Sequence, residues 1–251
     1  MRWGALGLLG LLIACSPAHS VDAPEANTPV FVHQTTDLVL PAEPEVPSTG
    51  PRICTRAVDL IVAFEIGSPE VYQAKYRHPI WPGAASGVTV GIGYDLGYQL
   101  RSIIIVDWAS HPHAARLASV AGITGPLARE EVRQLADITI EYGHARQVFD
   151  QTSVVIHHNV ARRVFRPENF DRLPCGARGA LLSLVFNRGG SMTGPARTEM
   201  RHIRDICLPA QDTACIADQL RAMVRIWAGS SIENGMKRRR FAEAELAMSE
   251  P

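Results

Sequence analysis

The chain has 251 residues, of which 46% are hydrophobic, so it is long enough and apolar enough to bury a sizeable core. Its 25 basic and 25 acidic residues cancel, although all but Lys75 and Lys237 of the basic residues are arginine. A net charge of zero argues against the strong positive field of nucleic-acid-binding domains, and we predict no nucleic-acid partner.

The first twenty residues have the composition of an export signal. Arg2 precedes an apolar run from Leu6 to Ile13, which is too short to span a bilayer but fits the hydrophobic part of a signal peptide. The sequence Leu12-Ile13-Ala14-Cys15 resembles the lipobox of bacterial lipoproteins, in which the cysteine is acylated and becomes the new N-terminus. We therefore expect residues 1–20 to be a signal peptide with lipidation at Cys15, and the protein to lie in the periplasm or cell envelope. Cleavage after Ala18-His19-Ser20, giving a secreted protein, is the alternative.

Residues 21–51 are predicted to form a tether. They contain six prolines and show little periodic pattern. A flexible coil of about thirty residues spans on the order of 30 Å, and prolines extend it further. We expect the folded domain to occupy residues 52–251.

Four cysteines remain once Cys15 is set aside: Cys54, Cys175, Cys207 and Cys215. An even number in an exported chain predicts two disulfides. The short segment between Cys207 and Cys215 makes their pairing the simplest choice, which leaves Cys54 with Cys175. Four cysteines allow three pairings, and the sequence leaves the other two open. A zinc site is disfavoured because no Cys-x-x-Cys spacing occurs.

The domain begins with a predicted helix and a predicted glycine-rich hairpin. Apolar residues at three- and four-residue steps indicate an amphipathic helix from Arg52 to Ile66, with Glu65 near its end. From Gly87 to Asp95 the period changes to two, which indicates a strand. If this strand alternates regularly, Thr89 and Asp95 point the same way.

The rest of the chain has helical patterns. The predicted helices are 129–149 with an interruption near Gly143, 155–164, 175–187, 197–206, 216–227 and 235–248. We therefore expect an α+β fold that is mostly helical, with one small antiparallel sheet.

Five pieces of the chain resemble the lysozyme-like muramidases of phages and bacteriocins, and most closely the muramidase domain of pesticin. They are Phe64-Glu65-Ile66-Gly67, residues 87–93 (Gly-Val-Thr-Val-Gly-Ile-Gly), residues 94–97 (Tyr-Asp-Leu-Gly), residues 184–189 (Leu-Val-Phe-Asn-Arg-Gly), and Arg238-Arg239-Arg240 with Glu243. The first three are specific together, whereas the last two are weak alone. The resemblance implies a lysozyme-like fold.

In that family the glutamate at the helix end is the general acid, so the resemblance implies that Glu65 protonates the leaving sugar oxygen. The edge of an apolar helix suits this role, since a carboxyl group that stays protonated near neutral pH needs partial desolvation. The usual phage pattern has an acid or a cysteine six residues before the threonine, where this chain has Gly83. Pesticin-like members carry the aspartate six residues after it. This implies Asp95 as base or electrostatic stabiliser and Thr89 as the group that orients water.

The resemblance also places Asn187 in the sugar cleft, where an amide can pair with N-acetyl groups. Each assignment has a structural alternative: Glu65 as a solvated helix-end residue, Asp95 as the cap of a turn, and Asn187 as a helix C-cap. We expect residues 238–240 to lie on a solvated face with one arginine packed or paired. An inverting enzyme would separate its two carboxyl groups by roughly 6.5–9.5 Å, and a retaining one by about 5 Å.

We therefore expect a muramidase that hydrolyses the bond between N-acetylmuramic acid and N-acetylglucosamine in peptidoglycan. No metal or organic cofactor is implied, and the histidines at 111, 113, 157 and 158 lack the spacing of a helical metal pair. Two alternatives stay open: a non-catalytic peptidoglycan-binding lipoprotein, and a lytic transglycosylase, which needs the acid but not Asp95. The oligomeric state and the identity of the target wall are also left open.

Overall fold

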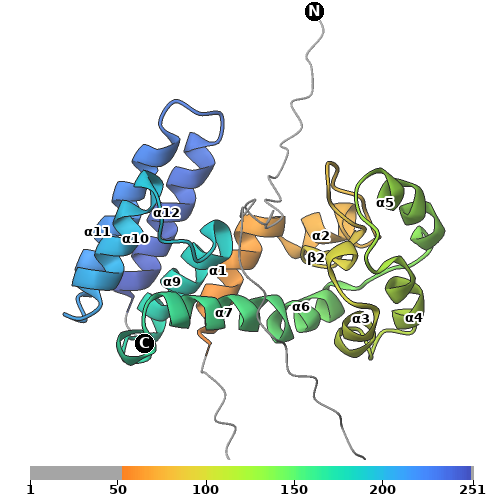
Figure 1. Ribbon diagram of the computed structural model, residues 1–251, viewed down its shortest axis with the longest axis horizontal. Coiled ribbons are helices and arrows are strands. Elements are labelled where there is room, and N and C mark those ends of the chain that lie inside the picture. The colour runs from red at the N-terminus through yellow and green to blue at the C-terminus, as the bar shows by residue number, and fades with distance from the viewer. Residues whose placement is uncertain (1–52, 250–251) are drawn as a thin grey trace, which may run out of the picture. The chain divides into compact units, whose positions relative to one another are not determined.

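The computed structural model describes residues 53–249 (Figure 1). The predicted signal peptide, the lipidation site Cys15 and the predicted tether lie outside these residues. Within residues 53–249, no helix is both long enough and apolar enough to cross a membrane.

The described chain is mostly helical and contains one two-stranded antiparallel sheet, as predicted. The strands are β1 (Thr89–Val90) and β2 (Tyr94–Asp95). The helices are α1 (Thr55–Ile66), α2 (Pro69–Lys75), α3 (Arg101–Asp107), α4 (Ala114–Leu117), α5 (Pro126–Glu131), α6 (Tyr142–Gln151), α7 (Ser153–Val164), α8 (Pro167–Phe170), α9 (Cys175–Arg188), α10 (Thr198–His202), α11 (Thr213–Ala222) and α12 (Glu233–Met248), with short 3-10 and π turns between some of them.

The glycine-rich segment from Gly87 to Asp95 is a hairpin, as predicted, but the chain reverses within the segment and does not run through it as one alternating strand. Gly91 and Gly93 adopt positive φ angles of 60° and 72°, which glycine tolerates readily, and they reverse the chain. Thr89 consequently lies directly opposite Asp95 in the antiparallel register. The two residues share one side of the sheet because they are cross-strand partners, and not because they alternate along one strand.

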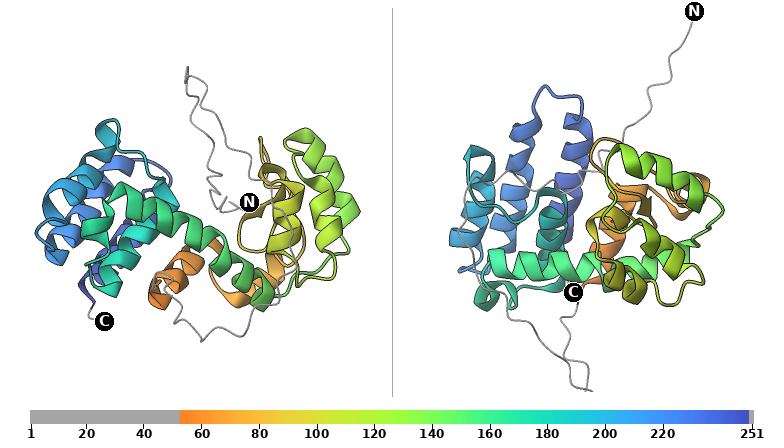
Figure 2. Two further views of the ribbon diagram at one scale, coloured as in Figure 1. Left: turned by 60° about the horizontal axis from the view of Figure 1, so that its bottom comes forward. Right: turned by 45° about the vertical axis from the view of Figure 1, so that its right-hand side comes forward.

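Two clusters of buried apolar side chains form the interior, and three helices contribute to both. The first cluster gathers around the hairpin and includes Val88, Val90, Ile92, Tyr94 and Trp108. The second gathers around α9, α11 and α12 and includes Leu181, Leu184, Ile216, Leu220 and Ala244. The shared helices are α1, α7 and α9. In both views of Figure 2, the α6–α7 segment (green to teal) connects elements of the first cluster to elements of the second.

The predicted helix 129–149 is wrong in its middle. The structure has α5, a short 3-10 turn over Val132–Leu135 and then α6, with a non-helical stretch between the turn and α6. In that stretch Ile138 and Ile140 are both fully buried, a two-residue spacing that extended backbone can supply. The Ile140 N–H donates to the carbonyl of Arg77, and the Tyr72 hydroxyl donates to the carbonyl of Ile140. Pairing with Tyr72 in α2 and with Arg77 just after it therefore replaces helical bonds here.

Both predicted disulfides are confirmed. Cys54 is bonded to Cys175, which joins the residue before α1 to the first residue of α9. Cys207 is bonded to Cys215 and closes the loop that precedes α11. The first bridge closes a loop of sequence separation 121. Cross-linking a loop of that size removes chain entropy worth about 4–5 kcal/mol from the unfolded state.

Three histidines lie together beside the core residue Trp108. The ring centroids of His111 and His144 are 5.1 Å apart, and those of His111 and His113 are 5.7 Å apart. His111 is buried, and its Nδ1 accepts a hydrogen bond from the His113 backbone N–H. His144 Nε2 lies 2.9 Å from Ser110 Oγ. Trp108 also packs edge-on against Tyr94, so this group of histidines adjoins the hairpin.

Acidification is expected to lower the melting temperature of the domain. Burial lowers the pKa of His144, and the neighbouring His111 lowers that pKa further, while burial also lowers the pKa of His157 and His158. The unfolded chain, with histidine pKa values near 6.5, therefore takes up protons before the folded one. The stability that these groups contribute is complete above about pH 6.5 and declines below it.

Melting curves between pH 7.5 and 5 would measure this slope. His144→Gln is expected to flatten it, whereas His202→Gln, at an exposed histidine, is the matched control and should leave it unchanged. An unchanged slope in the His144 variant would contradict this account.

Candidate active site

Glu65 occupies the last turn of α1 and faces a buried arginine of the C-terminal helix. Its side chain is 19% exposed, and Arg239 Nη1 donates to Glu65 Oε1 at 2.8 Å. The helix stops two residues later at Gly67, whose φ of 86° breaks the helical geometry. Among residues 53–249, no side chain donates a hydrogen bond to the second oxygen, Oε2.

Arg239 belongs to a buried ionic network that α12 builds with α9. Glu243 is fully buried, and its Oε1 accepts from Ser183 Oγ at 2.7 Å, from Arg240 Nη2 at 2.8 Å and from Arg239 Nε at 3.3 Å. The Arg239 guanidinium also lies 5.4 Å from the ring centroid of Phe64. Two arginines and one carboxylate buried together hold each other in place, because unpaired buried charges are costly. Glu65 is thereby attached to α12 through Arg239.

Residues 238–240 were predicted to lie on a solvated face with one arginine packed or paired, but two of the three arginines are buried. Arg239 and Arg240 are 4% and 0% exposed, and only Arg238 is exposed. The available signal was the spacing, because Glu243 lies three and four residues after the two buried arginines on one helix face. The charge of these arginines alone suggested that they are exposed to solvent, and it did not reveal that this face of α12 packs against α9.

Asn187 joins the same network through its side-chain oxygen. Arg240 Nη2 donates to Asn187 Oδ1 at 3.1 Å. Helix α9 continues one residue further to Arg188, and Gly189, with φ of 70°, is its C-cap. Asn187 therefore does not occupy the C-cap position that the structural alternative gave it. Asn187 is half-buried as a residue, and its amide nitrogen has no hydrogen-bond partner within the described part of the chain, so it is left to donate to a ligand.

Asp95 organises the hairpin with its own carboxylate. Its oxygens accept from the backbone N–H of Gly87 at 3.0 and 3.1 Å and from that of Gly97 at 2.9 Å, which caps the 3-10 turn Leu96–Tyr98. The approach is close, since a Cβ added at Gly87 would lie 2.3 Å from Asp95 Oδ1. Burial raises the pKa of Asp95, although these backbone donors oppose the shift. The structure thus shows the capping role that the sequence left as an alternative.

Replacing Asp95 by asparagine is expected to lower the free energy of unfolding by about 1–2 kcal/mol, because it weakens hydrogen bonds that end on a charged acceptor. Asparagine offers one acceptor oxygen in place of two, and its NH₂ group would face N–H donors. Urea unfolding of Asp95→Asn against Asp218→Asn, at an exposed aspartate, would measure the difference. Equal stability of the two variants would show that the cap contributes nothing.

The predicted site residues fall into two groups. Thr89, which is 5% exposed, and Asp95 are partners in the hairpin. Glu65 and Asn187 are linked through Arg239, Glu243 and Arg240. No hydrogen bond or ion pair among the described residues joins one group to the other. They share packing instead, since Val62 and Ile66 on the Glu65 helix enter the same core cluster as Val90 and Tyr94 of the hairpin.

The sequence also did not predict that His157, on α7, lies near Glu65. Its Nδ1 is 2.6 Å from the carbonyl of Ser153, and its ring centroid is 4.4 Å from that of Phe186. Burial lowers the pKa of His157, and the charge of Glu65 acts on it in the opposite direction. Nothing in the local sequence distinguishes His157 from its neighbour His158, which packs against Phe170 instead.

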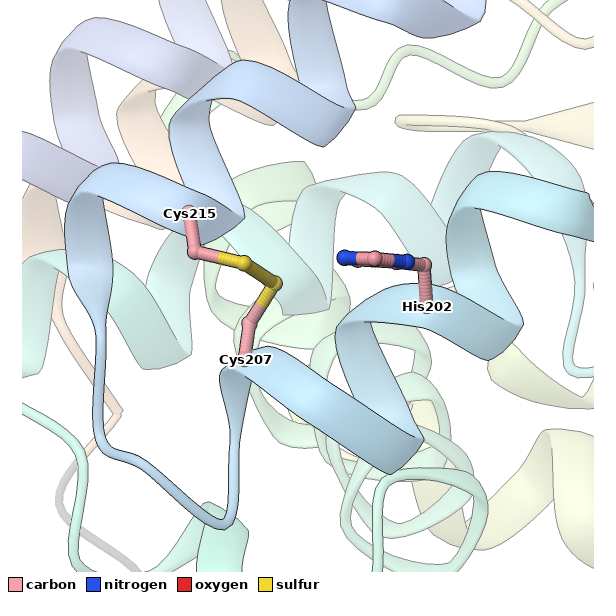
Figure 3. A group of neighbouring side chains, drawn as sticks. All are labelled: His202, Cys207 and Cys215. Carbon is pink, nitrogen blue, oxygen red and sulfur yellow. A yellow bond between two sulfur atoms is a disulfide. The ribbon is translucent and has the colours of Figure 1, made fainter.

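One group of described residues brings together side chains of the kinds that bind metal ions, and Glu65 is not part of it. The ligand atoms of His202, Cys207 and Cys215 lie within 4.8 Å of one another. Figure 3 shows the His202 ring directed toward the bond that joins the two sulfur atoms. Metal binding by cysteine requires the thiolate, which a disulfide does not supply. We therefore assign these cysteines to the disulfide.

Comparison with known proteins adds no relative to this picture. No family model matches the chain, and the search of curated proteins found no match. The function must therefore be inferred from the residues themselves.

Proposed function

We propose that the protein is a peptidoglycan hydrolase of the lysozyme-like type, cleaving the bond between N-acetylmuramic acid and N-acetylglucosamine. The observation that carries the proposal is Glu65, a largely buried carboxyl group at a helix end. One of its oxygens is held by Arg239, and the other has no donor among residues 53–249. Partial burial and a fixed orientation are what a general acid for glycoside cleavage needs.

In this proposal Glu65 donates the proton of Oε2 to the leaving sugar oxygen as the glycosidic bond breaks. The hairpin supplies the second function. Asp95 provides negative charge near the developing positive charge on the sugar, and the Thr89 hydroxyl orients the attacking water. Asn187 binds an N-acetyl group through its amide nitrogen. If the water attacks the face opposite Glu65, the product is inverted at the anomeric carbon.

A non-catalytic peptidoglycan-binding protein is the second candidate, and two observations favour it. Asp95 is already engaged by the backbone N–H groups of Gly87 and Gly97, and Glu65 Oε1 is engaged by Arg239. A protein that only binds the wall would use the same groups for structure. We also propose export and lipid anchoring at Cys15, and the disulfides agree with an oxidising compartment.

Product analysis separates these functions. The protein is incubated with purified peptidoglycan, and the soluble fraction is examined by mass spectrometry. Hydrolysis should release fragments with reducing N-acetylmuramic acid ends. Anhydro ends would instead show a lytic transglycosylase, and wall binding without release would show the non-catalytic protein. Nuclear magnetic resonance of the first anomer released would test inversion, and retention would contradict the water-attack model.

A further inference from the structure

A group of arginines surrounds Trp227 and continues the ionic network that holds Glu65. The Arg188 guanidinium lies 4.9 Å from the Trp227 ring centroid, and the Arg240 guanidinium lies 5.9 Å from it. Arg197 donates through Nη2 to the carbonyl of Arg188. We call Arg188, Arg197, Arg240 and Trp227 the arginine–tryptophan cluster. It adjoins the proposed substrate contact directly, because Arg240 also binds Asn187.

The cluster holds positive charge that its protein surroundings do not fully pair. Arg188 Nε and both Arg240 Nε and Nη1 are buried and have no hydrogen-bond partner in the described part of the chain. Burial, with the nearby charges of Arg197 and Arg240, lowers the pKa of Arg188 to about 10, while the charges of Glu199 and Glu243 act in the opposite direction. Buried donors without acceptors and adjacent like charges are both unfavourable, and an anion bound at the exposed part of Arg188 would offset the repulsion between the like charges.

The acids around the cluster are already engaged. Glu243 accepts from Arg239 and Arg240, and Glu199 accepts from Arg225. One oxygen of each glutamate is buried without a partner, but neither carboxylate forms an ion pair with Arg188 or Arg197 among the described residues. Arg188 and Trp227 are only half-buried, so part of each is open to solvent. A ligand from outside can therefore reach the exposed part of Arg188, whereas Arg240 and the unpartnered nitrogens lie behind it.

We propose that the arginine–tryptophan cluster is a subsite for a carboxylate of the peptidoglycan substrate. Arg188 contacts the carboxylate, Trp227 provides an apolar face for the attached sugar or peptide, and Arg240 connects the subsite to Asn187 and Glu65. The inference rests on the proposed function, since it names the part of the wall that this site recognises. Peptidoglycan offers two sources of carboxylate: the stem peptides of intact walls, and the lactyl groups that are freed when the peptides are removed.

The test measures wall binding, so that it does not depend on hydrolysis. The full chain is sedimented with intact walls, with glycan strands stripped of peptides, and with carbodiimide-amidated samples of each. Wild-type protein is expected to bind carboxylate-bearing walls about tenfold more tightly than amidated ones. Preference for intact walls would identify the stem peptides as the source, and preference for stripped strands would identify the lactyl groups. Equal binding to native and amidated material would overturn the proposal without any variant.

Three variants test whether Arg188 is responsible for the preference for carboxylate-bearing walls. Arg188→Gln is expected to lose the tenfold preference, and Arg188→Lys to keep part of it. Arg163→Gln, which removes the same charge from an exposed position on α7, should bind like the wild type. If the Arg188→Gln variant retains the full preference for carboxylate-bearing over amidated walls, the proposal is overturned. If the wild type releases no fragments yet keeps its carboxylate-dependent binding, the proposed hydrolysis fails while the subsite stands.

Discussion

Replacing Glu65 with glutamine is expected to abolish the release of fragments from peptidoglycan while leaving wall binding intact. Glutamine keeps an oxygen that can accept from Arg239, so the α1–α12 contact survives, but it has no acidic proton to transfer. Loss of a general acid lowers catalytic rates by about 10²–10⁴. Turbidity of wall suspensions and mass spectrometry of the soluble fraction would follow the release, and co-sedimentation would follow binding.

The matched control for this experiment is Glu70→Gln, at an exposed carboxylate early in α2. It should release fragments at the wild-type rate. A Glu65→Gln protein that stays folded and keeps more than about a tenth of the wild-type rate would remove Glu65 from the role of acid. Simultaneous loss of binding and of release would instead indicate that Glu65 positions the substrate.

Replacing Glu243 with glutamine should give the largest loss of stability among single polar substitutions in α12. Glu243 is the fully buried carboxylate shared by Arg239, Arg240 and Ser183. Removing its charge leaves two buried guanidinium groups, and Glu65 is the one carboxylate among the described residues that still forms an ion pair with either of them. Breaking a buried ion pair from one side costs about 3–5 kcal/mol, because the remaining charge is left unpaired in a poorly solvated place.

Urea unfolding followed by circular dichroism would measure this loss against Glu245→Gln. Glu245 lies on the exposed side of the same helix, so its variant changes the net charge equally and should stay within about 0.5 kcal/mol of the wild type. A Glu243 variant as stable as the Glu245 variant would show that the two arginines find enough solvent or other partners without it.

The features that were predicted correctly are those set by local periodicity or by simple counting. The apolar spacing of α1 and α9 marked both helices to within a few residues, and four cysteines after a predicted export signal marked two bridges. The stretch around Ile138 and Ile140 was missed because its burial depends on pairing with Arg77 and Tyr72, which are distant in sequence. Helical periodicity on both sides concealed the change to extended backbone.

The candidate site shows the same difference between features set by local sequence, which were predicted, and contacts between distant elements, which were not. The residues that carry the resemblance were identified, but their partners depend on contacts between helices. Arg239 reaches Glu65 across 174 positions of sequence, and no local pattern encodes that pairing. The role of Asp95 was likewise decided by the close approach of the Gly87 and Gly97 backbones, which requires the hairpin to close first.

The Cys54–Cys175 disulfide also determines how the domain responds to mechanical tension. Any pulling force on the chain before residue 53 enters at Cys54, immediately before the helix that carries Glu65. The bridge passes that force directly to Cys175 at the start of α9, so α1 is not the element that bears the load. If the protein were bound to the wall and pulled through its N-terminal segment, Glu65 would stay in place. Reduction of the Cys54–Cys175 bond would let the same force separate α1 from the core.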